Sequence, residues 1–176
     1  RGVPVHDDFR KEELDIMRRV AGLPGDELAL AVASNIWRGA QLFKLKMERE
    51  ILREHALTFA SFSTLFIVWI WGPIETREIA RSQAVTKATV TSTVSKLESQ
   101  GFVKRRDSKV DKRLVTVELT GKGKRLIEWV FPKFNGGEVE IAKSLTEEEQ
   151  DTLAHLLRKV IRGMNGVSQD EEAERV

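Results

Sequence analysis

Apolar residues recur at helical spacing over most of the chain, and only residues 102–119 carry strand-like runs. Apolar positions at i, i+3, i+4 and i+7 are typical of an amphipathic helix with one buried face. They predict a long helix that Asp26 can cap and that ends near His55. Its apolar stripe is Leu28, Val32, Ile36, Gly39, Phe43 and Met47. They also predict a terminal helix, in which apolar positions 153–164 follow a capping box made by Thr146 and Glu149.

Three further helices are predicted outside the strand-like segment. Residues 8–20 form a short amphipathic helix, which Gly22-Leu23-Pro24-Gly25 ends. Thr58 caps a hydrophobic helix that continues through Trp69. A helix over residues 121–130 follows the strands. We expect Pro132 and Asn135-Gly136-Gly137 to kink or interrupt that helix, because proline removes a backbone donor and glycine is a poor helix former.

The segment before the strands has the pattern of a helix-turn-helix. A short helix over residues 76–81 and a turn over 82–85 precede a second helix over 86–100, which Gly101 stops. Val90, Val94 and Leu97 fall on one face of the second helix. The opposite face carries small or hydroxyl side chains and one lysine: Ala88, Thr89, Ser92, Ser95, Lys96 and Ser99. Such a face can approach base edges closely, so the second helix is predicted to enter the major groove of DNA.

A basic hairpin comes next, with runs over 102–106 and 114–119 joined by a polar tip. Its cations are Lys104, Arg105, Arg106, Lys109, Lys112 and Arg113. Because like charges this close repel, we expect the arrangement to lower stability unless a polyanion is bound. Asp111 can orient the guanidinium of Arg113, and an arginine at a hairpin tip suits the strongly negative minor groove.

The charge along the chain is strongly segregated. Residues 77–125 contain 13 Lys and Arg against 5 Asp and Glu, a net charge of +8, whereas the whole chain carries +2. The remaining residues therefore carry a net charge of −6. A basic middle between acidic ends is the electrostatic footprint of a nucleic-acid site on a scaffold that does not itself bind phosphate.

Together the motifs identify a resemblance to a known family. Residues 76–80 and 86–106, the Asp111-Lys112-Arg113 element and Leu119-Thr120-Gly121-Lys122-Gly123 resemble the MarR family of bacterial winged helix-turn-helix regulators. The resemblance covers roughly residues 27–164 and extends to Leu57-Thr58 and Leu145-Thr146. It implies a mostly α fold with a small β-hairpin wing, a winged helix-turn-helix with a helical dimerisation region. It further implies an obligate homodimer on a palindromic operator, usually a repressor relieved by a small ligand.

Three parts of the chain are expected on this basis. Residues 1–56 form N-terminal dimerisation helices, 57–125 the winged helix-turn-helix, and 126–176 C-terminal dimerisation helices. The apolar face of the terminal helix fits a seam between two copies, although packing onto its own subunit explains the periodicity equally well. The seam is favoured because a dimer presents two recognition helices spaced one DNA turn apart.

The candidate DNA contacts divide into base readers, phosphate contacts and a minor-groove contact. Thr89, Ser92 and Ser95 are expected to face bases, Lys87, Thr91 and Lys96 to hold phosphates, and Arg113 to enter the minor groove. The full predicted set is Thr76, Thr86, Lys87, Thr89, Thr91, Ser92, Ser95, Lys96, Arg105, Arg106, Lys109, Asp111, Lys112 and Arg113.

An effector site is also expected, because aromatic residues concentrate in the helices outside the helix-turn-helix. In the family the ligand pocket usually lies between the dimer helices and the winged domain. The candidate lining residues are Trp37, Arg38, Phe43, His55, Phe59, Phe62, Trp69 and Trp129, with Phe134 as a further candidate. Arg38, His55 or Arg81 would hold the charge of an anionic ligand, so the expected effector is a small aromatic or anionic molecule. Aromatic residues at helical spacing also fit a plain hydrophobic core.

Other classes of function find little support in the residues. The chain has no cysteine, which excludes disulfides and thiolate chemistry. Its three histidines lie in no metal-ligand spacing, and no glycine loop cradles phosphate, so no enzyme activity, metal or cofactor is predicted. The longest apolar run, residues 65–71, is far shorter than a membrane span, and no signal peptide is evident, so a cytoplasmic protein is expected. The alternative is a winged-helix module for protein–protein contact, with the basic hairpin meeting an acidic partner.

Overall fold

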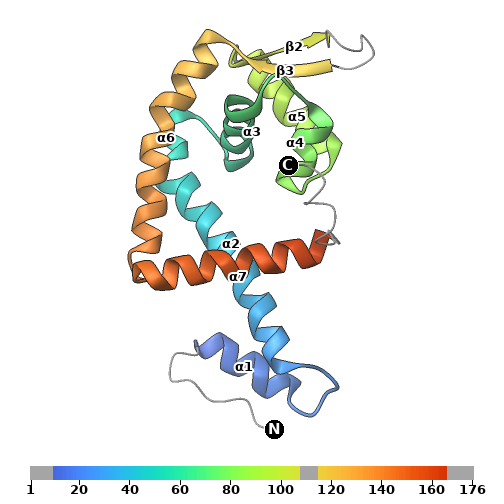
Figure 1. The fold of residues 1–176 in the computed structure, drawn as a ribbon, viewed down its shortest axis with the longest axis vertical. Helices are drawn as coiled ribbons and strands as arrows, with labels where there is room; N and C mark the ends of the chain where they lie inside the picture. Colours follow the sequence, from blue (N-terminus) through green and yellow to red (C-terminus); the bar gives the residue numbers. More distant parts are fainter. Residues whose placement is uncertain (1–9, 108–114, 166–176) are drawn as a thin grey trace.

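The computed structural model describes residues 10–107 and 115–165, which form helices and one small sheet at one end of the molecule (Figure 1). Along the chain, the elements are α1 (Lys11–Val20), α2 (Glu27–Glu50), the 3₁₀ turn η1 (Leu52–His55), α3 (Phe59–Trp71), β1 (Ile74–Glu75), α4 (Thr76–Gln83), α5 (Lys87–Ser99), β2 (Val103–Asp107), β3 (Val115–Leu119), α6 (Gly121–Ala142) and α7 (Glu147–Asn165). The predicted mostly helical winged helix-turn-helix is confirmed.

The winged unit consists of α3, α4, α5 and an antiparallel sheet in the order β1-β3-β2. In the hairpin Val103 pairs with Leu119 and Asp107 with Val115, as the strand-like runs predict. The sequence pattern misses β1, because two residues are too few to show an alternation. By pairing with β3, β1 ties the start of α4 to the sheet and so fixes the helix-turn-helix against the hairpin.

A single core holds these elements together. Val90, Val94 and Leu97 of α5 are fully buried, as their spacing predicts, together with Leu65 of α3 and Val117 of β3. Burying one such side chain contributes about 1.5–3 kcal/mol. The apolar face of α5 is therefore anchored inside the winged unit, which leaves the opposite face to solvent.

Residues at positive φ end the two helices of the helix-turn-helix. Gly101 has φ +74°, and the amides of Gly101 and Phe102 donate to the carbonyls of Glu98 and Leu97 (2.9 Å each), which closes α5. Ala84 ends α4 in the same way at φ +52°. There the Val85 amide donates to the Ala80 carbonyl at 3.1 Å. Both turns fix the direction in which the chain leaves a helix.

The joint between the hairpin and α6 explains the Leu119-Thr120-Gly121-Lys122-Gly123 motif. The Thr120 hydroxyl accepts a hydrogen bond from the Gly123 amide (3.0 Å) and donates to the Gly101 carbonyl (2.7 Å). A Cβ at Gly123 would lie 1.9 Å from the Phe102 carbonyl oxygen. The glycine therefore permits the first turn of α6 to approach the start of β2, so this segment is the beginning of the helix.

Of the kink or interruption expected near Pro132, the interruption is wrong, because α6 continues from Gly121 to Ala142. Proline in a helix interior costs about 3 kcal/mol. The contacts of the surrounding residues offset that cost, since Phe134 is buried against the rings of Phe43 and Phe62. Gly137 also has a packing role, because a Cβ there would lie 2.7 Å from the Ile51 side chain of the neighbouring segment. Tertiary packing overrides local propensity at both positions.

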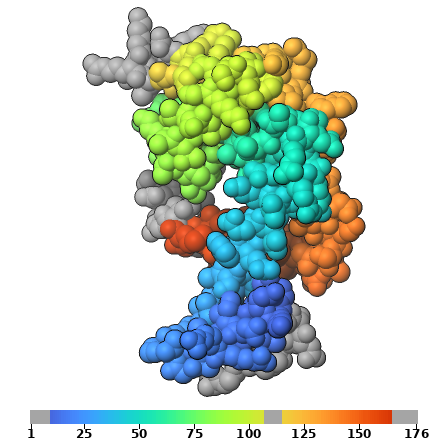
Figure 2. Space-filling model, turned by 180° about the vertical axis from the view of Figure 1, so that it is seen from behind, coloured from blue at the N-terminus to red at the C-terminus, as the bar shows by residue number. Residues whose placement is uncertain are grey.

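The helical arms, defined here as α1, α2, α6 and α7, extend away from the winged unit (Figure 1). Figure 2 shows α1 and the start of α2 as a lobe joined to the rest by a narrow stretch of α2. Within this lobe, the Asn35 side chain of α2 holds the start of α1. It accepts a hydrogen bond from Arg10 (3.1 Å) and donates one to the buried Glu13. Among the residues with described placement, no helix combines the length and apolarity needed to cross a bilayer.

The capping box of α7 is confirmed, since the Glu149 amide donates to the Thr146 hydroxyl and the Glu149 carboxylate accepts from the Thr146 amide. The apolar side chains of the arms, however, are largely uncovered. No α7 side chain in the described part of the chain is buried. The exposed large apolar residues of the arms include Leu28, Val32, Trp37, Leu42, Leu45, Val139, Leu153, Leu156, Ile161 and Met164.

Candidate nucleic-acid interface

The exposed face of α5 carries the small polar side chains that the sequence predicts there. Thr86 caps the helix, because its hydroxyl accepts a hydrogen bond from the Thr89 amide at 3.2 Å. The hydroxyls of Thr91 and Thr93 donate to the carbonyls of Lys87 and Thr89, at 2.9 and 3.0 Å. These local bonds satisfy threonine hydroxyls inside the helix and keep their methyl groups available for contact.

Three polar side chains on this face have no partner among the described residues. Within residues 10–107 and 115–165, no hydrogen bond or ion pair reaches the side chains of Lys87, Ser92 or Lys96. All three residues are exposed. The face therefore offers two cationic groups and one hydroxyl that a ligand outside the protomer can satisfy.

Arg105 of β2, in contrast, is fully engaged within the protein. Its guanidinium forms an ion pair with Glu98 and donates to the Ser95 hydroxyl at 2.8 Å. Its backbone amide also donates to the Glu98 carboxylate at 3.0 Å. These bonds hold β2 against α5, so Arg105 fixes the hairpin relative to this helix. Ser95, predicted as a base reader, lies under this guanidinium.

The other two described cations of β2 share one carboxylate of β3. Lys104 Nζ lies 2.8 Å and Arg106 Nε 2.7 Å from Glu118 Oε1. The repulsion expected among the hairpin cations is therefore offset for Lys104, Arg105 and Arg106, because cross-strand and helix carboxylates pair with them. Sequence alone does not show this pairing, since it depends on the β2–β3 register.

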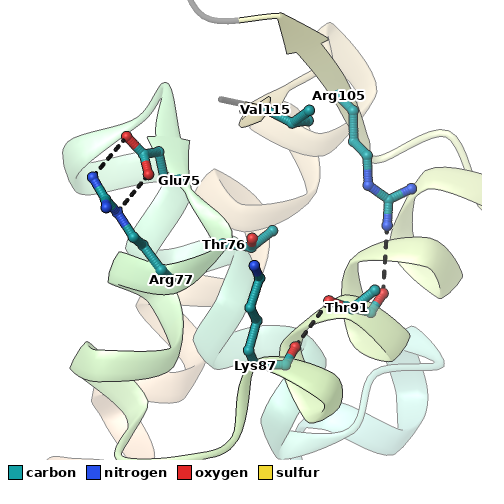
Figure 3. Close-up of a pocket in the computed structure, with 7 residues that line it drawn as sticks. All are labelled: Glu75, Thr76, Arg77, Lys87, Thr91, Arg105 and Val115. Carbon is teal, nitrogen blue, oxygen red and sulfur yellow. Dashed lines mark hydrogen bonds and ion pairs between the residues drawn. The ribbon is translucent and has the colours of Figure 1, made fainter. Parts of the chain in front are cut away.

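An open cleft of about 410 Å³ lies where α4, α5 and the hairpin meet (Figure 3). It is lined by Glu75, Thr76, Arg77, Lys87, Thr91, Arg105 and Val115. Figure 3 shows Lys87 extending from the start of α5 toward Thr76 at the start of α4. Arg77 pairs with Glu75 at 2.6 Å and so is held at the rim. The amino ends of two helices and the Lys87 ammonium make this corner favourable for an anionic group.

The structure brings Thr76, Lys87, Thr91 and Arg105 to this cleft and places Thr89, Ser92, Ser95 and Lys96 along the adjoining exposed face of α5. Four predicted DNA contacts, Lys109, Asp111, Lys112 and Arg113, lie outside the described residues. Glu75, Arg77 and Val115 were not predicted to be in the cleft. A sequence signal for Arg77 exists, because it lies in the first turn of α4 beside the predicted Thr76.

A second concavity of about 370 Å³ lies between α2, α3 and α6. Phenylalanine rings form most of its wall, with one hydroxyl and one carboxylate: Phe43, Phe59, Phe62, Ser63, Phe66, Phe131, Phe134 and Glu138. Of the predicted ligand residues, the structure brings Phe43, Phe59 and Phe62 into this wall, together with Phe134.

The remaining predicted ligand residues do not line this pocket. Trp69 packs on the Phe131 ring, with centroids 5.5 Å apart, from outside the wall. Trp37 and Trp129 are 67% and 64% exposed on α2 and α6. Arg38 and His55 are half-buried but do not line the pocket. Phe66, Phe131, Ser63 and Glu138 were missed, although the i, i+3, i+7 spacing of Phe131, Phe134 and Glu138 places them on one face of α6.

The sequence and the fold are similar to those of known regulators. The MarR family model matches residues 57–115. The uncharacterized HTH-type transcriptional regulator YwaE from Bacillus subtilis is 38% identical over 158 residues, which cover 88% of this chain and 92% of that protein. A MarR variant from E. coli, solved in complex with operator DNA, has a TM-score of 0.63 at 29% identity, covering 71% of this chain and 92% of that one. The MarR/EmrR family transcriptional regulator from Acinetobacter sp. ADP1 has a TM-score of 0.73 at 21% identity, covering 80% and 99%.

Proposed function

This chain belongs to the MarR family of transcriptional regulators, and we propose that it is a repressor that binds a palindromic operator in double-stranded DNA as a homodimer. A small aromatic ligand releases it. Because chromosomal DNA is the partner, the protein acts in the cytoplasm. Support for the DNA partner comes first from the face of α5, where Lys87, Ser92 and Lys96 are exposed and unpaired within the described chain.

In this proposal α5 enters the major groove. Thr89 and Ser92 face base edges, because their side chains are short enough for the helix to approach closely. Lys87 and Lys96 bind phosphates on either side, while Thr76 and Thr86 at the helix starts complete the phosphate contacts. The similar MarR variant from E. coli was solved with operator DNA, which supports the same partner here.

The hairpin adds a second contact. Arg105 and Arg106 keep it in place through their carboxylate partners. In the described part of the hairpin, Asp107 and Val115 are the last paired residues of the two strands. We assign Arg113, oriented by Asp111, to the minor groove, with Lys109 and Lys112 on the flanking phosphates. Since these four residues lie outside the described chain, this assignment depends on the sequence pattern.

The helical arms supply the dimer seam, with residues 1–56 and 126–176 packing against a second copy. The apolar face of α7 supports this assignment, because Leu153, Leu156 and Ile161 are exposed in a single protomer. A large exposed apolar surface marks an interaction site. Two-fold symmetry then places two α5 helices on successive major grooves of a palindrome.

The ligand occupies the aromatic pocket between α2, α3 and α6. This position supports a switching role, because α3 belongs to the winged unit while α2 and α6 belong to the arms. A molecule that changes the spacing of these helices changes the separation of the two α5 helices. A ligand that prefers one spacing therefore shifts DNA affinity.

Selection of bound sequences from a random pool of DNA duplexes at physiological salt tests the DNA-binding proposal. We expect enrichment of one palindrome of two short half-sites, centred about one or two helical turns apart. No enriched sequence, combined with binding of an acidic protein surface, would favour the alternative protein–protein module.

A further inference from the structure

The wall of the aromatic pocket consists mostly of phenylalanine rings. Its six rings come from three helices, with one phenylalanine from α2, three from α3 and two from α6. Its only other lining residues within the described chain are Ser63 and Glu138. The volume, about 370 Å³, lies at the small end of the roughly 300–1,000 Å³ that is usual for small-molecule sites.

The ring pairs of the wall include stacked, tilted and nearly perpendicular arrangements. Phe62 stacks on Phe134 with centroids 4.0 Å apart, and Phe66 stacks on Phe131 at 5.6 Å. Phe43 stands nearly perpendicular to Phe134, at 88°. Aromatic faces are electron-rich, and cages of several rings attract ammonium groups. The wall can therefore hold either a flat ring or a cation.

The one charged group of the wall is a carboxylate. Glu138 lies on the same face of α6 as Phe131 and Phe134, at the end of their stripe. The Asn135 amide donates to its Oε2 at 2.9 Å, and no Lys, Arg or His of the described chain forms an ion pair with it. Arg38 and His55, expected to hold an anionic ligand, are not part of the wall.

We propose that the effector is a small aromatic cation, which seats its ring among the phenylalanines and its ammonium group beside Glu138. This inference rests on the proposed role of the pocket as the ligand site. A cation gains from both the ring faces and the carboxylate as it leaves water. An aromatic carboxylate would meet a like charge in a low-polarity wall, where no described cation compensates its desolvation.

Three naphthyl probes, two of them matched in shape, separate charge from hydrophobicity. They are naphthylmethyl-trimethylammonium, its uncharged carbon isostere neopentylnaphthalene, and naphthylacetate. Each is titrated into the full-length protein without DNA, at low ionic strength, and the dissociation constant is measured by calorimetry. We expect the cation to bind about tenfold more tightly than its isostere, and the carboxylate to bind most weakly.

Two substitutions locate the effect. Glu138→Gln keeps the shape of the side chain and should weaken binding of the cation by about tenfold, while changing the affinity of the isostere less than about twofold. Glu140→Gln is the matched control, because Glu140 is exposed on the same helix and does not line the pocket. Its hydrogen bond from Lys143 lowers the pKa of Glu140, so the control removes the same charge. It should leave all three affinities unchanged.

Tighter binding of the carboxylate than the cation would overturn the inference, as would an unchanged affinity of Glu138→Gln for the cation. In both cases the pocket would remain a ligand site of different specificity. If none of the probes bound, the inference and the proposed ligand site would both fail. Selection from the DNA pool is independent of these titrations, so the DNA-binding proposal would stand or fall separately.

Discussion

Helices α5 and α7 are both amphipathic, but they leave opposite kinds of face exposed. The apolar residues Val90, Val94 and Leu97 of α5 are completely buried, and its polar face is exposed. In α7 the apolar residues Leu153, Leu156 and Ile161 are 45–51% exposed. An unpartnered polar and cationic face calls for an anionic partner, whereas an unpartnered apolar face calls for another apolar surface. The two exposed faces thus fit the two partners proposed above, DNA for α5 and a second copy for α7.

The largest expected effect is on dimerisation, and it tests whether the apolar face of α7 is the seam. Leu156→Asp places a charge in the proposed seam, and burying an unpaired charge at an interface is strongly unfavourable. We expect the dimer dissociation constant to rise by at least about a hundredfold, with a matching loss of affinity for a palindrome. Sedimentation at several protein concentrations measures the first quantity.

His155→Asp is the control for this substitution, because His155 is exposed on the face of α7 opposite the apolar stripe. It introduces the same charge outside the apolar stripe and should leave the dimer intact. A Leu156→Asp protein that stayed dimeric at submicromolar concentration would show that the seam lies elsewhere.

Sequence patterns predict the ends of helices well because caps are local. Thr58, Thr86 and Thr146 each accept a hydrogen bond from a backbone amide three residues on, and Gly101 adopts the positive φ that closes α5. The failure at Pro132 has a different origin, since the packing that keeps α6 continuous comes from helices far away in the sequence.

The same distinction applies to the candidate sites. The polar face of α5 follows from helical periodicity alone. The pairing of Arg105 with Glu98 and of Arg106 with Glu118 depends on how β2 packs on α5 and pairs with β3. The aromatic pocket draws on three helices, so composition indicates the residue type but cannot separate Phe66 in the wall from Trp37 on the surface.

An intermediate effect is expected on DNA affinity, and it tests whether the exposed face of α5 binds phosphates. Lys87→Ala removes a cation that has no recorded partner within the described residues, so the folded protein should lose little stability. Its affinity for the selected operator should fall by about tenfold, and the slope of log affinity against log salt should become shallower by about one per protomer. Filter binding or fluorescence anisotropy over a range of salt concentrations measures both quantities.

Lys44→Ala removes the same charge from the exposed surface of α2 and serves as the control. It should leave the salt slope unchanged, because α2 lies outside the proposed DNA-binding face. Equal slopes for Lys87→Ala and the unmodified protein would remove Lys87 from the phosphate contacts. A reduced preference for particular bases, without a change of slope, would assign it to base recognition.

The smallest expected effect is on the free energy of unfolding and concerns Ala84, which lies in the turn between α4 and α5. Its φ of +52° is unfavourable for a residue with a side chain, by about 1 kcal/mol. Ala84→Gly relieves that strain but raises the entropy of the unfolded chain by a similar amount, so the free energy of unfolding should change by less than about 0.5 kcal/mol. Ala84→Val keeps the strain and adds a β-branched side chain, which should cost about 1–2 kcal/mol.

Urea unfolding at fixed protein concentration distinguishes the two variants. The difference should be the same at low and high concentration, because Ala84 belongs to the winged unit and lies away from the proposed α7 seam. A difference that grew on dilution would mean that the turn also supports the dimer, and that the two unpartnered faces are coupled.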